Sequence, residues 1–406
     1  MKSQGNQCWY EFVYRIFRPV LDLFLPRKFN YEYKNIDIPR SHSPYIVISN
    51  HITFWDPLFV AISFKKQQFF VSSDQVMRAG IGGKLIRFLV NPIVRVKSQN
   101  ETQTVISIFK RLRQSNIVIF SEGTISYDGE TKMVMSSTGK LVKRSGASLV
   151  TFRISGGYFT YPRWARFHRK GKMTGKLVNI YSAEQLKAMT PEEINEQVYK
   201  DIYVNAYEDQ EKEPIAYKGK KLAEHLETAL YCCPQCKEFS TLTSNDDRFF
   251  CKCGFHVRYT EYGYFEYPQQ EQQDKKPTFT TILEWCKWQQ GIITDIVNRI
   301  NDLDVNTPIF TDHNQDLYLV TRAKKGDLQA SGTLHLYVDR LSLVTAEGKE
   351  INYPLDTIND TATFANSVFI FSTKEKQILE IKSEHPTCVI KYMEMFKLIR
   401  GAAKES

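Results

Sequence analysis

No apolar run in this sequence reaches the roughly 18 residues that a transmembrane helix requires. The N-terminus also lacks the apolar core and small-residue cleavage site of a signal peptide. The 8 cysteines among 406 residues are too few for a disulfide scaffold. Internal repeats are absent, and the shares of hydrophobic (42%) and charged (24%) residues are ordinary for a globular protein. The composition therefore excludes a polytopic membrane protein and a disordered chain, and the length predicts two or three domains.

Positive charge is concentrated in the first half of the chain. Residues 1–200 hold 30 Lys+Arg and 14 Asp+Glu, whereas residues 201–406 hold 24 and 31. A localised basic surface favours a phosphate-rich partner, which could be a nucleic acid, an anionic membrane or a phosphorylated small molecule. Composition alone does not choose among these.

The N-terminal segment mixes aromatic, aliphatic and basic residues over 9–28. This mixture suits a helix that lies in a membrane interface, and it equally suits a helix packed on its own domain. Pro19 is expected to kink or divide the helix in either case. We expect residues 1–39 to form amphipathic helices that hold a peripheral or monotopic protein on the cytoplasmic face of a membrane.

From Tyr45 onward, short apolar runs alternate with helical segments. Strands are expected over 45–49, 69–71, 92–96, 117–120 and 148–152, and a helix over 102–114. Strand–helix–strand order predicts an α/β domain over 40–230, with a largely parallel sheet flanked by helices.

The rest of the chain divides by composition into a cysteine module (residues 231–266), a linker and helix (267–304) and a C-terminal domain (305–406). The C-terminal domain shows period-two alternation followed by one helical segment, so it is predicted to be mostly β. It resembles a pleckstrin-homology-like or GRAM-like barrel.

A candidate catalytic pair follows the first predicted strand. His51 and Asp56 are spaced so that the carboxylate can fold back onto one imidazole nitrogen. The other nitrogen could then take a proton from a substrate hydroxyl. A His and an Asp at this spacing often occur by chance, and two further strand-end segments strengthen the prediction. One contains Arg95 and Lys97, and the other begins at Glu122.

These three blocks, in this order, resemble the glycerophospholipid acyltransferase family, that of 1-acyl-sn-glycerol-3-phosphate acyltransferase, over about residues 40–180. The resemblance implies that His51 is the catalytic base and Asp56 its orienting acid. It further implies an acyl-acceptor site at Glu122, Gly123 and Thr124. Arg95 or Lys97 would hold the acceptor phosphate, and residues 149–152 resemble the family's fourth motif.

Two positions depart from the family pattern. Ser121 stands where the family has Pro, and Ile125 stands where it has Arg, so one phosphate partner is missing. This affects the choice of headgroup more than acyl transfer itself. Basic side chains further along the chain could compensate: Arg153, Arg163, Arg166, His168 and Arg169.

The implied activity is transfer of an acyl chain from acyl-CoA or acyl carrier protein to the hydroxyl of 1-acylglycerol-3-phosphate or a related lysophospholipid, in phospholipid biosynthesis. The transfer would be direct, because the sequence has no G-x-S-x-G motif to supply a serine nucleophile. The expected partners are the membrane phospholipid surface, the lysophospholipid acceptor and the acyl donor.

The cysteine module predicts a metal site. Cys233 and Cys236 form a C-x-x-C pair, and Cys251 and Cys253 form a C-x-C pair, as in a zinc ribbon. Because the second pair is shorter than usual, Cys232 or His256 could substitute as a ligand. Four thiolates would saturate a tetrahedral zinc, which favours a structural role.

Two other functions fit parts of the sequence. The first is a nucleic-acid-binding protein built on the zinc ribbon, but the charges in residues 231–265 balance, so no nucleic-acid partner is expected. The second is a catalytically inactive membrane-binding scaffold, against which the intact His51, Asp56 and Glu122 argue.

Overall fold

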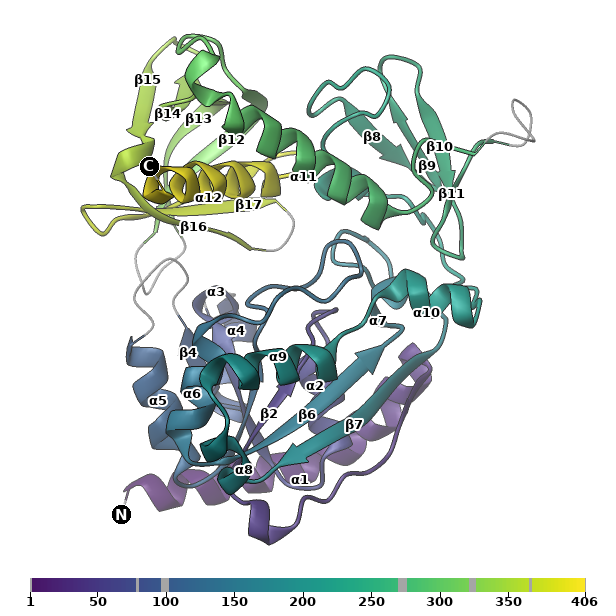
Figure 1. Cartoon of the computed structure of the whole chain (residues 1–406), viewed down its shortest axis with the longest axis vertical. Coiled ribbons are helices and arrows are strands. Elements are labelled where there is room, and N and C mark those ends of the chain that lie inside the picture. The colour runs from purple at the N-terminus through teal and green to yellow at the C-terminus, as the bar shows by residue number, and fades with distance from the viewer. Residues whose placement is uncertain are drawn as a thin grey trace. The chain divides into compact units, whose positions relative to one another are not determined.

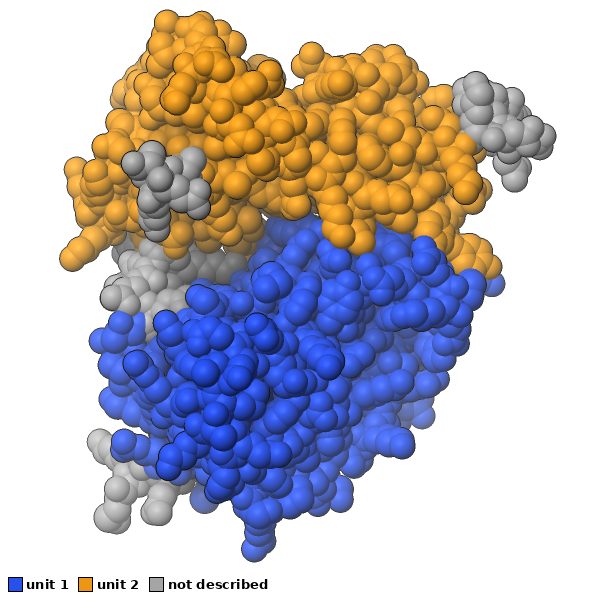
Figure 2. All heavy atoms as spheres, in the orientation of Figure 1, with its two compact units in different colours: residues 1–96, 100–163, 167–219 blue, residues 97–99, 164–166, 220–406 orange. Residues whose placement is uncertain are grey.

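The computed structural model describes residues 2–77, 80–95, 102–268, 276–320, 326–364 and 367–405. The chain forms two compact units (Figure 2). Unit 1 comprises residues 1–96, 100–163 and 167–219. Unit 2 comprises residues 97–99, 164–166 and 220–406.

Unit 1 is built on a sheet with the strand order β1-β7-β6-β2-β5-β3-β4 within the described residues (Figure 1). Neighbouring strands are parallel except β6 and β7, which are antiparallel. The expected largely parallel sheet is therefore confirmed, with one antiparallel pair that the sequence did not predict. The strands are β1 (Tyr31–Tyr33), β2 (Tyr45–Ser49), β3 (Gln68–Ser73), β4 (Ile93–Arg95), β5 (Asn116–Phe120), β6 (Ser148–Ser155) and β7 (Met173–Tyr181).

Helices cover both faces of this sheet, which is why β2 is buried along its whole length. Val47 faces a cluster that includes Phe59 of α2, whereas Ile46 and Ile48 face a cluster that includes Ile194 of α9. The helices of unit 1 are α1 (Lys2–Phe29), η1 (Arg40–His42), α2 (Asp56–Ser63), α3 (Asp74–Met77), α4 (Gly80–Leu89), α5 (Thr102–Leu112), α6 (Ser137–Ser145), α7 (Gly157–Thr160), α8 (Ala183–Ala188), α9 (Pro191–Ile202) and α10 (Ala206–Lys212).

The structure excludes one of the two effects expected of Pro19, the division of the N-terminal helix. α1 is continuous through Pro19 and is not divided there. Tertiary bonds hold the part of the helix that precedes this proline: Tyr14 Oη donates to the carbonyl of Ala61 at 2.7 Å, and Arg18 Nη2 donates to that of Ile62 at 2.9 Å. Packing against the end of α2 therefore offsets the backbone bond that a proline removes.

Unit 2 begins with the cysteine module, whose strands form an antiparallel sheet of order β11-β10-β9-β8 in the described part of the chain. These strands are β8 (Leu242–Asn245), β9 (Arg248–Cys251), β10 (His256–Tyr259) and β11 (Phe265–Glu266). A short helix, η2 (Leu226–Thr228), precedes them, and α11 (Ile282–Asn298) and η3 (Ile300–Asp302) follow. Trp285 of α11 donates through Nε1 to the carbonyl of Cys232 at 2.9 Å, which fastens this helix to the module.

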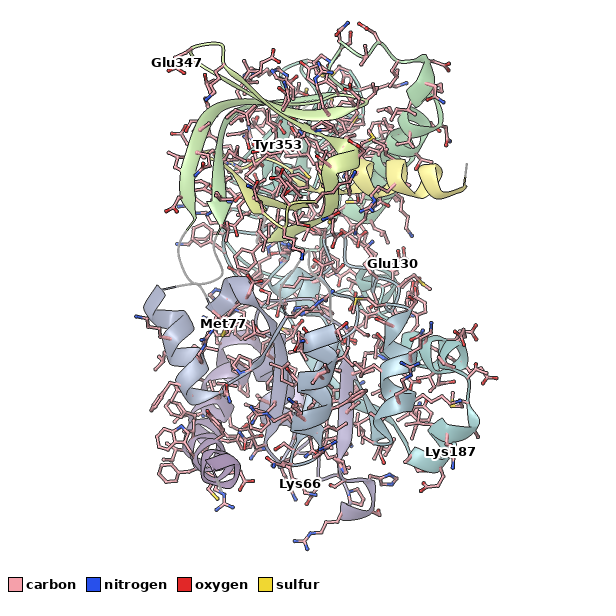
Figure 3. The ribbon with its side chains drawn as sticks, turned by 90° about the vertical axis from the view of Figure 1, so that its left-hand side faces the viewer. Lys66, Met77, Glu130, Lys187, Glu347 and Tyr353 are labelled. Atoms are coloured by element: carbon pink, nitrogen blue, oxygen red, sulfur yellow. The ribbon has the colours of Figure 1, made fainter. Side chains whose placement is uncertain are left out.

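The C-terminal domain is an antiparallel sheet of order β15-β14-β13-β12-β18-β17-β16 in the described residues, followed by α12 (Ile390–Glu405). Tyr353 of β15, which is labelled in Figure 3, packs edge-on against Phe371 of β17. The ring centroids are 5.0 Å apart. The sheet therefore curls over on itself, as expected of a barrel-like β domain. Its elements are β12 (Phe310–Val320), β13 (Asp327–Leu336), β14 (Arg340–Thr345), β15 (Glu350–Pro354), η4 (Leu355–Thr357), β16 (Ile358–Phe364), β17 (Val368–Thr373) and β18 (Ile378–Ser383).

A buried polar cluster joins the cysteine module to the C-terminal domain inside unit 2. Asp312 of β12 accepts hydrogen bonds from Lys391 Nζ, Tyr392 Oη and Ser240 Oγ, each at 2.7 Å. The Lys391 side chain is fully buried. A buried ammonium needs this carboxylate, so the cluster makes the two parts depend on each other.

Candidate active site and metal centre

Asp56 lies at the first turn of α2, directly after the loop that leaves β2. Its carboxylate accepts the backbone N–H groups of Ile52 at 2.6 Å and Thr53 at 2.8 Å. The Thr53 hydroxyl donates to the other oxygen at 2.7 Å. A carboxylate at a helix N-terminus is stabilised by the helix dipole, so this short loop is tightly held.

The predicted pair is in contact. Nδ1 of His51 lies 2.9 Å from Oδ2 of Asp56, whose side chain is fully buried, whereas the His51 side chain is 19% exposed. Because the carboxylate accepts at Nδ1, we assign the imidazole proton to Nδ1, which leaves the lone pair on Nε2. This arrangement can accept a proton at Nε2 and stabilise the imidazolium that results.

Two further residues of unit 1 hold this loop, and sequence reasoning missed both. The Phe120 ring, at the end of β5, stacks on the His51 ring with centroids 4.3 Å apart. The Asn50 side chain exchanges two hydrogen bonds of 2.8 Å with the backbone of Ile154. Only strand pairing could have revealed the first contact, because Phe120 is the partner of Ser49 across β2 and β5.

Glu122 is buried beneath the His51 loop. Its carboxylate accepts the His51 N–H at 2.6 Å and the Lys132 N–H at 2.7 Å. Burial raises the pKa of Glu122 to about 8, although both backbone donors favour the ionised form. The carboxylate therefore positions the backbone that carries the histidine.

The turn after Glu122 carries two arginine contacts. Gly123 has φ +73°, and a Cβ there would lie 3.7 Å from Nη1 of Arg95. Nη1 of Arg163 donates to the hydroxyl of Thr124, and also to the carbonyl of Ile125 at 3.2 Å. Lys97, the other predicted phosphate ligand, lies outside the described residues.

The loop that follows Glu122 is hydrogen-bonded to His51 and to the second half of unit 1. Ser126 donates its backbone N–H to the carbonyl of His51 at 3.0 Å. Further along, the carboxylate of Glu130 accepts the hydroxyl of Tyr203 at 3.2 Å (Figure 3). The segment from Glu122 to Ser126 therefore forms hydrogen bonds with both the N–H and the carbonyl of His51.

Of the basic residues expected to compensate for Ile125, Arg163 contacts that residue. Arg153 instead donates to the carbonyl of Asp201 at 2.9 Å, which joins β6 to α9. Arg166 pairs with Glu224 at 3.8 Å, and both belong to unit 2. The ring of His168 contacts that of Phe29, and Arg169 is buried.

The cysteine module brings its predicted ligands together. Within the described residues, the sulfur atoms of Cys233, Cys236, Cys251 and Cys253 all lie within 4.8 Å of one another. The Sγ–Sγ distances are 3.7 Å for Cys233–Cys253 and for Cys236–Cys251. Tetrahedral Zn–S bonds of about 2.3 Å would hold two sulfurs about 3.8 Å apart, so the cluster fits such a metal. The alternative ligands Cys232 and His256 are not part of it.

Residues 30–155 match the family model described as Acyltransferase. This part of the chain is therefore similar to acyltransferases. It contains His51, Asp56, Arg95 and the turn that begins at Glu122, whereas Arg163 lies beyond the match.

Solved structures similar to the chain include the 1-acyl-sn-glycerophosphate (LPA) acyltransferase PlsC from Thermotoga maritima, at 15% identity and a TM-score of 0.40, covering 53% of this chain and 83% of that one. Dcp1p is similar at 10% identity and a TM-score of 0.20, covering 26% and 88%. The C-terminal domain of an unknown protein from Leishmania infantum has 11% identity and a TM-score of 0.15, covering 23% and 84%. No curated protein matches the chain.

Proposed function

We propose that the protein transfers an acyl chain from acyl-CoA or acyl carrier protein to the hydroxyl of 1-acylglycerol-3-phosphate or a related lysophospholipid, in phospholipid biosynthesis. The observation that carries this proposal is the 2.9 Å contact between His51 Nδ1 and the buried Asp56 carboxylate, inside a part of the chain that is similar to acyltransferases. A histidine held in this way is suited to act as a general base towards a hydroxyl.

The reaction would proceed without a covalent enzyme intermediate. Nε2 of His51 takes the proton of the acceptor hydroxyl as its oxygen attacks the thioester carbonyl of the donor. The C–S bond then breaks, and the departing thiolate takes the proton from the imidazolium, so that an ester and a free thiol are formed. The Asp56 carboxylate stabilises the imidazolium between the two steps.

The membrane surface is the proposed source of the acceptor. None of the helices among the described residues is long and apolar enough to cross a membrane. One face of α1 nevertheless exposes large apolar side chains while the opposite face packs on its own domain. The exposed residues are Trp9, Phe12, Ile16, Phe17, Val20, Leu23 and Phe24.

Basic residues accompany this face. Nζ of Lys28 lies 4.7 Å from the centre of the Trp55 ring and 5.2 Å from that of Phe24. Aromatic side chains at headgroup depth beside basic residues are typical of helices that lie in the interface of an anionic membrane. We therefore assign α1 to peripheral attachment at the cytoplasmic face.

The cysteine cluster is proposed to hold a structural zinc ion. Cys233, Cys236, Cys251 and Cys253 would each supply a thiolate, and a bound zinc would contribute to the folding of a module with little core of its own.

A thiol-release assay tests the reaction. The purified protein is given acyl-CoA and, in detergent micelles, lysophosphatidic acid, glycerol 3-phosphate or other lysophospholipids. We expect release that depends on the acceptor, is lost in His51→Ala and is retained in His385→Ala, which changes an exposed histidine of unit 2. Folded protein that releases no thiol with any acceptor, from either acyl-CoA or acyl carrier protein, would contradict the proposal.

A further inference from the structure

The end of α1 carries a positive charge that is held by aromatic rings. Nζ of Lys28 lies 4.7 Å from the centre of the Trp55 ring and 5.2 Å from the centres of the Phe24 and Phe29 rings. Among the described residues, no carboxylate forms an ion pair with it. Aromatic rings attract a cation without cancelling its charge. The ammonium group of Lys28 is therefore held in place and remains able to bind an anion.

A second basic side chain lies against the same aromatic cluster. The ring of His168, in the segment after α7, packs edge-on against that of Phe29, with centroids 5.9 Å apart. Partial burial lowers the pKa of His168, and the positive charges of Lys28 and Lys170 lower it further. Three basic groups from two distant segments of unit 1 therefore lie close enough to act on one another.

Lys170 also faces a lysine across a backbone bridge. Lys170 and Lys218 lie directly opposite each other in an antiparallel bridge, and each donates its N–H to the carbonyl of the other, at 2.8 and 2.9 Å. Both side chains are exposed, and in the described part of the chain neither forms an ion pair. Like charges that are directly opposite destabilise such a pair. An anion bound between the two ammonium groups would remove this repulsion.

Large apolar side chains are exposed next to these basic groups in the sequence. Leu23 and Phe24 of α1 are 59% and 47% exposed, and Phe167, which precedes His168, is 40% exposed. Basic residues beside exposed aromatic and aliphatic residues suit the interface of an anionic membrane, in which the apolar groups meet the acyl region and the cations meet the phosphates. A dissolved phosphate would leave these apolar side chains in water. The surroundings therefore favour a phosphate that belongs to a lipid.

From these contacts we infer that unit 1 has a binding site for the phosphate groups of anionic phospholipids, made by Lys28, His168, Lys170 and Lys218. This headgroup site rests on the proposed function, because it requires that α1 attaches to a membrane. It adds a second segment of the chain to the surface that contacts lipid, and it gives that surface a preference for anionic over zwitterionic lipid. None of its four residues belongs to the catalytic pair.

The chemistry of the headgroup site explains this preference. An ammonium group has three N–H donors, and a phosphodiester offers oxygen acceptors and one negative charge. Zwitterionic phosphatidylcholine carries a trimethylammonium group that offsets its phosphate, so a cluster of cations gains less from it. Each lysine near an anionic surface is expected to strengthen binding about fivefold.

Co-sedimentation of the intact chain with vesicles tests the headgroup site. The vesicles contain phosphatidylcholine alone, or equal parts of phosphatidylcholine and phosphatidylglycerol, at one fixed ionic strength. One variant combines Lys170→Gln with Lys218→Gln, and a second carries Lys28→Gln. The matched control combines Lys110→Gln with Lys140→Gln, two exposed positions of α5 and α6, which cover the sheet face opposite α1. It changes the net charge by the same amount as the first variant.

Lys170→Gln with Lys218→Gln is expected to weaken binding to the mixed vesicles about 10- to 30-fold, and Lys28→Gln about fivefold. Binding to phosphatidylcholine alone should change less than about twofold in both, and the control should stay within about twofold of wild type on either vesicle. Because the first variant removes a repulsion, its melting temperature should equal or exceed that of wild type, so unfolding would not account for its weaker binding.

A competition experiment distinguishes lipid from dissolved phosphate. Inorganic phosphate at millimolar concentration is added to protein bound to the mixed vesicles, and sodium chloride of the same ionic strength is added to a second sample. Equal release by the two salts is expected for a site that takes lipid phosphate. Greater release by phosphate than by chloride would show that the site takes the dissolved anion and would overturn the inference.

Equal losses in the headgroup and control variants, or equal losses on both kinds of vesicle, would also overturn the inference and leave the proposed acyl transfer untouched. The thiol-release assay in detergent micelles separates the two, because the micelles contain no anionic phospholipid besides the acceptor. We expect both headgroup variants to retain acyl transfer there within about twofold of wild type, and a larger loss would place these residues in the reaction and overturn their separate role. A wild-type protein that binds the mixed vesicles but transfers no acyl chain would end the proposed transfer and leave the headgroup site standing. A wild-type protein that binds neither kind of vesicle would end the attachment of α1 and the headgroup site together.

Discussion

At the scale of single residues, the site depends on how many bonds fix each side chain. The carboxylate of Asp56 accepts two backbone N–H groups and one hydroxyl in addition to the imidazole of His51. Without its charge, the side chain at this position would leave the loop close to its present path. It would no longer stabilise an imidazolium or select the tautomer with the Nε2 lone pair.

We expect Asp56→Asn to lower kcat for acyl transfer about 100-fold or more, with little change in the KM for either substrate, because the lost interaction acts on the proton transfer. The thiol-release assay measures both quantities. Asp37→Asn, on an exposed carboxylate that pairs with Lys65, is the control and should remain within about twofold of wild type. A large rise in KM with kcat unchanged would contradict the role given to Asp56.

A second prediction at this scale concerns Glu122 and the dependence of stability on pH. Burial raises its pKa from 4.5 to about 8. The folded protein therefore retains a proton that the unfolded chain has released between these values, so stability is lost as the pH rises through the folded pKa. We expect the unfolding free energy of wild type, relative to that of Glu122→Gln, to fall between about pH 5 and pH 9. Urea unfolding at several pH values measures the difference, and a difference that is constant with pH would contradict the prediction.

At the scale of secondary-structure elements, α1 has two faces with different roles. Tyr14 and Arg18 bond the end of α2, while the apolar face with Val20 and Leu23 is exposed. Exposed apolar surface of this size is unusual for a protein that meets only water.

We expect Val20→Asp combined with Leu23→Asp to reduce binding to vesicles of phosphatidylcholine and phosphatidylglycerol at least about tenfold, because each change removes exposed apolar area that the membrane would bury and adds a charge that anionic lipid repels. Co-sedimentation with the vesicles measures the binding. Leu398→Asp, on an exposed position of α12, is the matched control. Equal sedimentation of all three proteins would show that α1 is not the attachment site.

At the scale of the whole molecule, polar side chains connect the parts of unit 2. Lys391, Asp312 and Ser240 connect the C-terminal domain to the cysteine module, and the hydroxyl of Tyr231 donates to the carboxylate of Glu394 at 2.9 Å. Ser240 lies close in sequence to Cys236 of the cysteine cluster, so the cluster and the buried ion pair share one short segment.

Removal of the proposed zinc ion by a chelator should therefore loosen both parts of unit 2. We expect backbone amides of β12 and α12 to exchange with deuterium at least about tenfold faster after chelation, while amides of β2 and β5 in unit 1 keep their rates. Hydrogen exchange measured by mass spectrometry gives both values in one experiment, and Cys236→Ser should reproduce the effect without a chelator. Faster exchange confined to residues 231–266 would show that the junction does not transmit the loss.

How well the sequence predicted strands and contacts depended on how far apart along the chain the interacting residues lie. The strands β2 and β5 were predicted because buried parallel strands are continuous apolar runs. β1, with its three residues, and β7, which alternates irregularly between buried and partly exposed positions, have no such pattern.

The sequence by itself determined the contacts between residues that lie a few positions apart in the chain. His51 and Asp56 meet across a strand-to-helix loop, and each cysteine pair lies on a short turn, so local geometry alone can bring these side chains together. The assembly of four cysteines at one point already required the pairing of β9 with its neighbours.

The tertiary structure alone decided what surrounds these groups. Phe120 reaches His51 because β2 and β5 are adjacent and parallel, and Arg163 reaches Thr124 across a separation of 39 residues. Such contacts follow from strand order and loop path, which no local spacing encodes. The proposed proton transfer thus depends on one short segment, whereas the aromatic and basic side chains around it come from segments that only folding brings together.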